Sequence, residues 1–183
     1  MADIIEGSFS GNGLKLGVVA ARFNEFVTKS LVDGALNELR RLGVQDSDIY
    51  LAWVPGAYEI PAACQTMIDT RQPDALVTIG CVIRGETSHY EHIAQSVSDA
   101  LQKIALERRM PIGFSVLTVE NLEQAIDRAG GKQGNKGREA ARTAVEMANL
   151  FHALKNDETE KEKAVERLLN EEFKKLIESM ELR

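Results

Sequence analysis

Short hydrophobic runs alternate along this chain with longer stretches in which hydrophobic positions recur every three or four residues. The first pattern predicts buried strands and the second predicts amphipathic helices. The expected strands span residues 14–20, 49–54, 75–83 and 112–118, and the expected helices span 24–42, 57–70, 88–108, 122–129 and 138–154. This alternation predicts an α/β fold with helices on both faces of a parallel sheet. Residues 3–9 could add an edge strand, either to this sheet or to the sheet of another subunit.

Composition and charge limit the partners of such a protein. The 183 residues fit one ordinary domain, and the net charge of -6 gives no general attraction to nucleic acid or to an anionic membrane. The N-terminus lacks the basic start and apolar run of a secretory signal, and no apolar stretch approaches membrane-spanning length. Cys64 and Cys81 form no CxxC pair and are expected to be buried thiols. These features predict a cytoplasmic protein in a reducing setting.

Each predicted strand is followed by an unusual polar or glycine-rich segment. These segments read ARFNEF, VPGAYEIP, RGETSHYEH and TVENLEQAIDRAGGKQGNKG in chain order. In open α/β sheets, ligands bind outside the carboxyl ends of the strands. The four loops are therefore predicted to form one site at one edge of the sheet.

The third loop carries the groups best suited to acid–base chemistry. Ser88 and Glu91 have the spacing of a capping box, which predicts a helix that begins at Ser88 and points free N–H groups at a phosphate near residues 85–87. His89 would lie in the first turn, where its imidazole could transfer protons near neutral pH. The local sequence alone favours an exposed histidine on a capped helix.

Glu86, His89 and His92 recur every three residues and raise the alternative of a metal site. The capping pattern argues against it, because Glu86 would lie outside a helix that starts at Ser88. The two histidines that remain have a spacing that is common by chance. His92 is then expected to be a partly buried helix residue, and no metal is expected.

The first two loops each allow a functional and a structural interpretation. Phe23 could stack on a flat heterocycle, or it could be a core residue next to Asn24 as the N-cap of the following helix. Glu59 could accept hydrogen bonds from ligand hydroxyls, or it could complement a helix dipole. Nothing local decides between these interpretations.

The fourth loop combines glycines with basic residues. Four glycines stand among Arg128, Lys132, Lys136 and Arg138. The segment lacks the GxxxxGK[ST] order of a P-loop, so nucleotide hydrolysis is not supported. It could bind an anion, or it could connect two helices and expose its cations to solvent.

Taken together, these segments resemble the 6,7-dimethyl-8-ribityllumazine synthase family. The motifs are RFN at 22–24, VPGAYEIP at 54–61, GCVIRGETSHY at 80–90, FSVLT at 114–118, EQAIDRAGGKQGNKGREAA at 123–141 and EMANLFHAL at 146–154. They stand in the family's order and spacing over about residues 3–154, which is more than a single motif could supply by chance. The resemblance divides the chain into a synthase domain at 1–154 and a charged extension at 155–183.

The resemblance implies a specific reaction and assembly. The family condenses 5-amino-6-(D-ribitylamino)uracil with 3,4-dihydroxy-2-butanone 4-phosphate, releases phosphate and water, and makes the precursor of riboflavin. No metal or organic cofactor is implied. The implied fold is a flavodoxin-like three-layer αβα sandwich with a four-stranded parallel sheet. The implied assembly is a homopentamer or a shell of sixty subunits, with active sites between neighbouring subunits.

The resemblance also assigns roles to individual residues. Phe23 would stack on the pyrimidine, and His89 would donate protons. Arg128 would clamp the phosphate from across a subunit boundary, where Phe114 would also contribute and Lys136 could add positive charge. The other expected contacts are Ala57, Tyr58 and Glu59 with the ribityl chain and ring, Cys81, Val82 and Ile83 with the pyrimidine, and Glu86 and Thr87 with the phosphate.

The chain departs from the family pattern in two places. Glu86 puts a carboxylate near the expected phosphate, where many relatives have a small residue, so its backbone is the part expected to contribute. The tail beyond Leu154 is longer than is usual, and its apolar positions over residues 165–180 recur at helical spacing. This predicts an amphipathic helix that docks on its own subunit or pairs with another tail. The glycine-rich loop has no insertion, which resembles members that form closed shells.

Two other functional classes stay open at this point. A non-catalytic member could bind a flavin-like ligand or form a shell, although His89, Arg128 and Phe23 argue against it. An FMN-binding electron carrier of similar topology is disfavoured, because the first loop lacks the Gly, Ser and Thr density of a phosphate-binding turn.

Overall fold

A computed structural model of the chain describes residue 2 and residues 4–157. The main sheet contains the strands β1 (Leu16–Ala21), β2 (Ile49–Val54), β3 (Ala75–Ile83) and β4 (Ile112–Val119). The helices are α1 (Glu25–Arg41), α2 (Ile60–Arg71), α3 (His89–Glu107), α4 (Leu122–Arg128) and a C-terminal helix described over 136–157, with the short 3₁₀ turns η1 (Asp46–Asp48) and η2 (Ala57–Glu59). A small hairpin, β5 (Ala129–Gly131) and β6 (Gly134–Asn135), follows α4.

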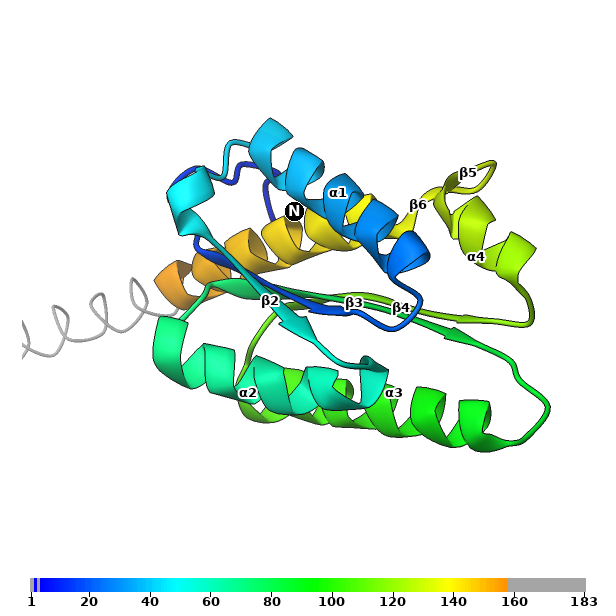
Figure 1. The fold of residues 1–183 in the computed structure, drawn as a ribbon. Coiled ribbons are helices and arrows are strands. Elements are labelled where there is room, and N and C mark those ends of the chain that lie inside the picture. Colours follow the sequence, from blue (N-terminus) through cyan, green and yellow to red (C-terminus); the bar gives the residue numbers. More distant parts are fainter. Residues whose placement is uncertain (1, 3, 158–183) are drawn as a thin grey trace, which may run out of the picture.

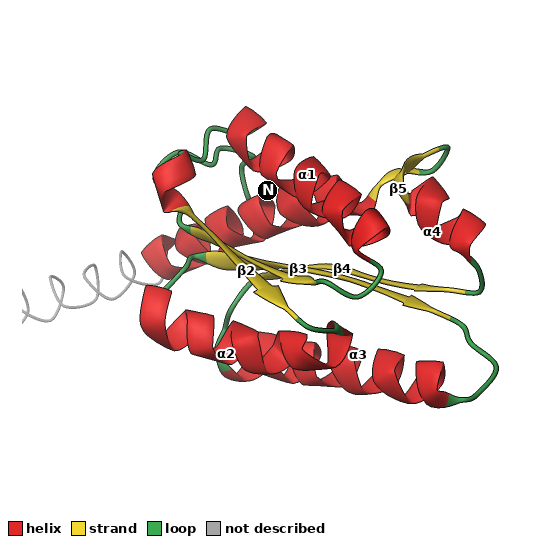
Figure 2. Ribbon diagram, viewed as in Figure 1, coloured by secondary structure: helices red, strands yellow, loops and turns green. Residues whose placement is uncertain are grey.

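The main sheet is parallel throughout and has the strand order β2-β1-β3-β4. The helix α1 and the C-terminal helix cover one face, while α2 and α3 cover the other (Figure 1). Figure 2 shows the same three layers by type of element. This arrangement confirms the predicted α/β sandwich, and its strand order is that of flavodoxin-like folds.

The central strands are buried on both faces of the sheet, and for this reason they form continuous hydrophobic runs in the sequence. All six residues of β1 are buried, and β3 is buried from Ala75 to Cys81. One core cluster includes Leu31 of α1 and Val145 of the C-terminal helix, and the other includes Ile60 of α2 and Val97 of α3. Each cluster fixes one helical layer on the sheet, so the loops at the strand ends have a rigid base.

The N-terminal segment is the main difference from the predicted elements. Residues 4–9 form no strand, so the prediction of an edge strand in the main sheet is wrong for the described part of that segment. They lie on the C-terminal helix instead, where Asn149 Nδ2 donates hydrogen bonds to the carbonyl oxygens of Ser8 and Ser10 at 2.9 and 2.8 Å. Gly7 fits there because a side chain would meet the carbonyl oxygen of Glu146.

The predicted amphipathic helix over residues 165–180 lies outside the described residues. In the described part of the chain, no helix has the length and apolar character needed to cross a membrane.

Candidate active site

A cavity of about 400 Å³ opens at the carboxyl ends of β1, β2 and β3. It is lined by Phe23, Gly56, Ala57, Tyr58, Glu59, Cys81, Val82, Ile83, Gly85, Thr87, His89, Tyr90 and Ile93. Three of the four predicted loops therefore meet in one place. The fourth loop does not line this cavity in its own chain, so the contribution of that loop to a four-loop site stays a prediction.

Backbone hydrogen bonds bring the first two loops together. The ladder between β1 and β2 continues beyond the strands, since the N–H of Arg22 donates to the Val54 carbonyl at 2.8 Å and the N–H of Phe23 donates to the Pro55 carbonyl at 3.0 Å. The Phe23 side chain is 68% exposed and lines the cavity, so its interpretation as a core residue is wrong. An exposed aromatic ring at a cavity can stack on a flat ligand.

Glu59 stabilises the turn at the bottom of the second loop. Its Oε2 accepts a hydrogen bond of 2.9 Å from the N–H of Gly56, which closes a capping arrangement around η2. The side chain is nevertheless exposed and lines the cavity. Because a carboxylate can accept several hydrogen bonds, the capping role leaves room for a ligand hydroxyl.

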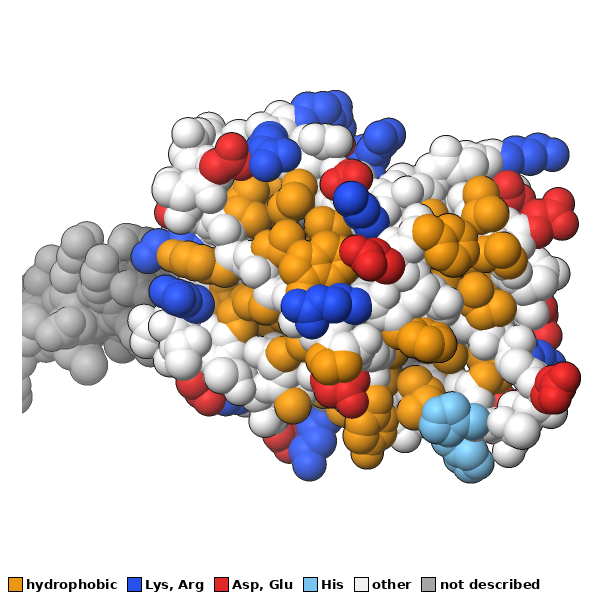
Figure 3. All heavy atoms as spheres, in the orientation of Figure 1, with side chains coloured by type: hydrophobic (Ala, Val, Ile, Leu, Met, Phe, Trp, Pro, Cys, Tyr) orange, Lys and Arg blue, Asp and Glu red, His pale blue; other side chains and the backbone are white. Residues whose placement is uncertain are grey.

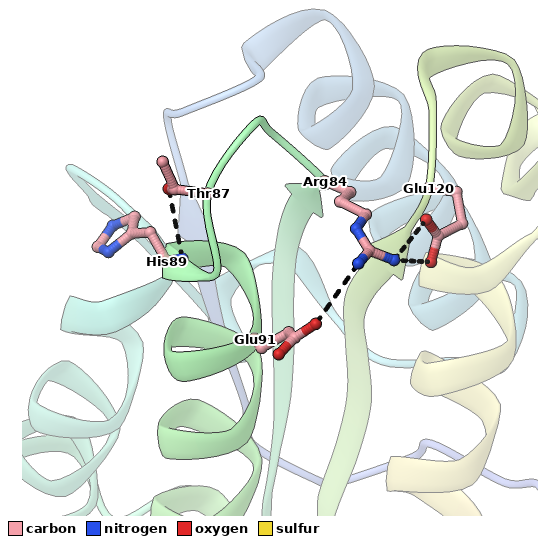
Figure 4. Close-up of polar contacts among 5 residues, drawn as sticks. All are labelled: Arg84, Thr87, His89, Glu91 and Glu120. Carbon is pink, nitrogen blue, oxygen red and sulfur yellow. Dashed lines mark hydrogen bonds and ion pairs between the residues drawn. The ribbon is translucent and has the colours of Figure 1, made fainter.

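The third loop leads into α3, whose N-cap is Ser88 as predicted. The capping box itself is wrong, because the Ser88 side chain makes no cap hydrogen bond and the Glu91 carboxylate lies 3.7 Å from Arg84 Nη2 instead. The N–H of His89 donates to Thr87 Oγ1 at 3.5 Å (Figure 4). The His89 side chain is exposed and lines the cavity. The dipole of α3 favours an anion at this end of the helix, although the Glu91 N–H already donates to the Ser88 carbonyl at 3.0 Å.

The histidine pair does not form a metal centre with its neighbours. His92 is exposed rather than partly buried, and it does not line the cavity. Within the described residues, no group of three His, Cys, Asp or Glu side chains is arranged to hold a metal ion.

The part of the cavity lining that comes from β3 is apolar, and its cysteine is not reactive. Cys81 is 2% exposed, and its burial raises the thiol pKa to about 11. Cys64 lies deeper in the core, where burial raises its pKa to about 12. Both are free thiols, as predicted. Cys81 is therefore neutral at physiological pH and serves as a wall of the cavity, together with Val82 and Ile83.

Hydrophobic side chains gather across one face of the molecule, and histidine side chains lie near one edge of that face (Figure 3). An apolar cavity of this volume with a few polar groups at its mouth suits one small heterocycle with a polar chain. A sequence model of the family described as 6,7-dimethyl-8-ribityllumazine synthase matches residues 13–152, which is more than half of the chain. The chain belongs to the 6,7-dimethyl-8-ribityllumazine synthase family.

Membership of the synthase family defines the reaction. The protein is a transferase of riboflavin biosynthesis that condenses 5-amino-6-(D-ribitylamino)uracil with 3,4-dihydroxy-2-butanone 4-phosphate. Its substrates are small molecules. The described residues give no support to the non-catalytic alternative or to an electron carrier.

Three residues expected at the synthase site lie outside the cavity of their own chain. Glu86 is exposed on the third loop and does not line it. Phe114 is 49% exposed on β4. Arg128 ends α4, where its Nη1 donates to the Gln124 carbonyl at 3.4 Å. One chain alone therefore does not join Arg128 to His89.

The glycine-rich segment of the synthase is a hairpin rather than an irregular connection. Asn135 Nδ2 donates to the carbonyl oxygens of Ser30 and Ala129 at 2.9 and 3.2 Å, which ties β6 to α1 and to β5. Lys136 Nζ lies 2.6 Å from Glu139 Oε2, so its charge is already balanced within the chain. This ion pair reduces the positive charge that Lys136 could add at the expected phosphate site.

The cavity also includes Gly85, near which a phosphate was predicted, and three residues for which no substrate contact was predicted. These three are Gly56, Tyr90 and Ile93. Tyr90 and Ile93 follow His89 by one and four positions, and helical spacing from a site histidine is the signal that could have identified Ile93.

A larger groove of about 660 Å³ runs along β2 and α2. Its lining includes Thr66, Thr70 and Arg71 but no histidine or carboxylate. The smaller cavity is therefore the better candidate for the synthase reaction.

Proposed function

We propose that the pyrimidine substrate binds in the cavity of one subunit, that His89 transfers protons during the condensation, and that Phe114 and Arg128 of a neighbouring subunit complete the site. The assembly in this proposal is a homopentamer, alone or within a sixty-subunit shell, in the cytoplasm. The observation that carries the proposal is the meeting of Phe23, Cys81 and His89 in one cavity while Arg128 lies outside it.

The cavity suits the pyrimidine and its ribityl chain. Val82 and Ile83 supply apolar walls, and Phe23 offers an exposed ring at the mouth. Glu59 presents a carboxylate that can accept hydrogen bonds from ribityl hydroxyls. Such a lining orients a flat ring while its polar chain reaches the second loop.

The start of α3 suits the phosphate and the proton transfers. The aromatic amine attacks the ketone carbon, and one water leaves as the imine forms. Loss of a proton from the adjacent carbon then expels phosphate from the next carbon, and the ribitylamino nitrogen attacks the carbonyl that results, which closes the ring with loss of a second water. Thr87 lines the cavity next to the first turn of α3, where the helix dipole would stabilise a departing phosphate. His89 lies in the same turn and can accept and return protons, while the site holds two reactants together.

Exposed apolar side chains support an assembly of several subunits. Phe26, Phe114, Leu122 and Ile126 are each about half exposed, at 55%, 49%, 46% and 50%. Large apolar side chains that remain exposed on a subunit commonly mark contact surfaces. Arg128 ends the helix that carries Leu122 and Ile126, so a neighbour that covers this surface would also receive the arginine.

Complementation between two inactive variants tests the proposal. We expect His89→Gln and Arg128→Met to lose most lumazine formation separately, as followed by product absorbance. Chains of both variants are then co-expressed so that they assemble together. Random placement in a ring gives about one quarter of sites both an intact His89 and an intact Arg128, so about a quarter of wild-type activity returns.

Variants assembled separately and then combined provide the control, because their rings contain a single type of chain. If mixed assemblies form but recover no activity, His89 and Arg128 do not act across a subunit boundary. If the wild-type protein forms no lumazine from the two substrates, the catalytic proposal is wrong and the non-catalytic alternative replaces it.

A further inference from the structure

Arg84 joins the loop that carries His89 to two neighbouring elements. Its Nη1 lies 3.5 and 3.2 Å from the two carboxylate oxygens of Glu120, at the end of β4, and its Nη2 lies 3.7 Å from Glu91 in the first turn of α3 (Figure 4). The guanidinium carbon is also 5.9 Å from the centre of the Tyr90 ring. The Arg84 side chain, directly after β3, thus contacts both the first turn of α3 and the loop that follows β4.

We propose that Arg84 is a positioning residue that fixes the first turn of α3, and with it the His89 imidazole, relative to the end of the sheet. This inference rests on the proposed role of His89 in proton transfer. Arg84 itself does not line the cavity, so its effect passes through the turn that it holds.

The anchors of Arg84 are themselves fixed. The Arg84 N–H donates to the Val119 carbonyl at 2.9 Å, which extends the ladder between β3 and β4 by one residue. The N–H of Glu120 donates to Gln124 Oε1 at 2.9 Å, so the partner loop is held to α4. The Arg84 side chain therefore spans from the rigid sheet to the start of α3.

The segment between these anchors is held weakly by other contacts. Gly85 has nothing within 4 Å of the position of a side chain, and Ser88 makes no side-chain cap. The bond from the His89 N–H to Thr87 Oγ1 is long, at 3.5 Å. Among the described contacts of residues 85–88, none replaces the link that Arg84 makes across the loop. Loss of Arg84 would free the turn that orients His89.

Stability and activity should respond differently to that loss. The side chains of Arg84, Glu91 and Glu120 are 52%, 61% and 53% exposed, and exposed ion pairs stabilise a fold little. Catalytic geometry is more sensitive, because a displacement of about 1 Å can reduce a rate about 100-fold. The signature of a positioning role is a lower kcat with an unchanged thermal midpoint.

The first test uses Arg84→Met, with Arg40→Met as the matched control. Arg40 is a similarly exposed arginine, with its Nε 2.7 Å from Asp46 Oδ1, and it lies away from the cavity. We expect Arg84→Met to lower kcat about tenfold, within the range for a small displacement, while KM for the pyrimidine stays within about twofold. Arg40→Met keeps wild-type kcat, and both variants keep the thermal midpoint.

A double-mutant cycle shows whether Arg84 acts through His89. If it does, Arg84→Met lowers kcat in the wild type but has little further effect in the His89→Gln background. Arg84→Lys, which can still pair with one carboxylate, restores part of the loss. Glu120→Gln lowers kcat in the same direction, and its effect does not add to that of Arg84→Met.

Several outcomes would overturn the inference. Arg84→Met with kcat within twofold of wild type, an equal loss in the His89→Gln background, or a fall in the thermal midpoint that accounts for the lost activity would each do so. Failure of the underlying function is separate, because it would appear as an active His89→Gln variant or as an inactive wild type.

Discussion

The side-chain amide of Asn24 donates a hydrogen bond of 2.9 Å to the carbonyl oxygen of Cys81, and thereby joins the loop after β1 to β3. Asn24 has the left-handed backbone angle φ of 58°, which asparagine tolerates better than most residues. It is the N-cap residue of α1 but makes no side-chain cap bond with that helix. Its side chain instead links the loop that carries Phe23 to Cys81, and both residues line the same cavity.

We expect Asn24→Ala to be less stable and to bind the pyrimidine more weakly. The substitution removes the bond to Cys81 and puts a less tolerant residue at a left-handed position, which together cost about 1–3 kcal/mol. Displacement of Phe23 raises KM for the pyrimidine. Denaturant unfolding and steady-state kinetics measure the two effects.

Asn24→Gly separates the two causes. Glycine accepts the left-handed angle, so this variant loses the hydrogen bond without the backbone penalty. It should be more stable than Asn24→Ala but share its raised KM. An alanine variant as stable as the glycine variant would exclude a contribution from backbone strain.

Glu59 and Arg128 are expected to serve different substrates. Arg128→Met should weaken the phosphate substrate about tenfold more than the pyrimidine, and Glu59→Gln should do the reverse, because each change removes a charged hydrogen-bonding group. Glutamine can still accept from the N–H of Gly56, so the turn at η2 is retained. Equal effects on both substrates in binding measurements would contradict this division.

The sequence predicted the fold well because the strongest patterns arise from burial. The observed β2 and β3 have the predicted bounds, and β1 and β4 differ by one or two residues. Strands covered on both faces must be hydrophobic throughout, and this signal is local in the sequence. Residues 4–9 have no such local pattern, and the position of this segment depends on hydrogen bonds from the distant Asn149.

The sequence predicted which residues lie at the candidate site better than it predicted the contacts between them. The spacing of Ser88 and Glu91 fits a capping box, but Arg84 lies close enough to take Glu91 as an ion-pair partner. Arg84 is itself drawn to Glu120 on another loop, and no local pattern shows that proximity. The positions of Phe114 and Arg128 relative to His89 depend on a second subunit, so the fold of one chain leaves them as predictions.

Glu38 should make stability depend on pH in the acidic range. This side chain is 3% exposed between α1 and the C-terminal helix, where its oxygens accept hydrogen bonds of 2.6 and 2.9 Å from Arg41. The Arg41 bonds hold the carboxyl pKa below its ordinary value of 4.5, against the opposing effect of burial, and the nearby charges of Arg142 and Arg138 act in the same direction as Arg41.

Because the folded pKa is lower than the unfolded one, the stabilisation is present above pH 4.5 and is lost as the pH falls through the folded pKa. We expect Glu38→Gln to be less stable at pH 7 by about 1.5 kcal/mol or more, and to lose less further stability on acidification than the wild type. Asp46→Asn, at an exposed ion pair, is the control and should change stability by less than about 0.5 kcal/mol. Thermal midpoints between pH 7 and pH 3 measure the difference, and parallel curves for Glu38→Gln and the wild type would contradict it.

Cys64 and Cys81 should resist alkylation in the folded protein. Burial raises their pKa to about 12 and about 11, so both stay protonated at neutral pH, and iodoacetamide reacts with the thiolate. Mass spectrometry should find neither residue labelled at pH 8 until the protein is unfolded. The raised pKa also implies that stability is retained below about pH 9.0, the ordinary thiol value, and decreases as the pH rises towards 11, because the unfolded thiols ionise first. Cys81→Ala should lose less stability than the wild type over that alkaline range, and rapid labelling of Cys81 in the folded wild type would show that the cavity floor is open to solvent.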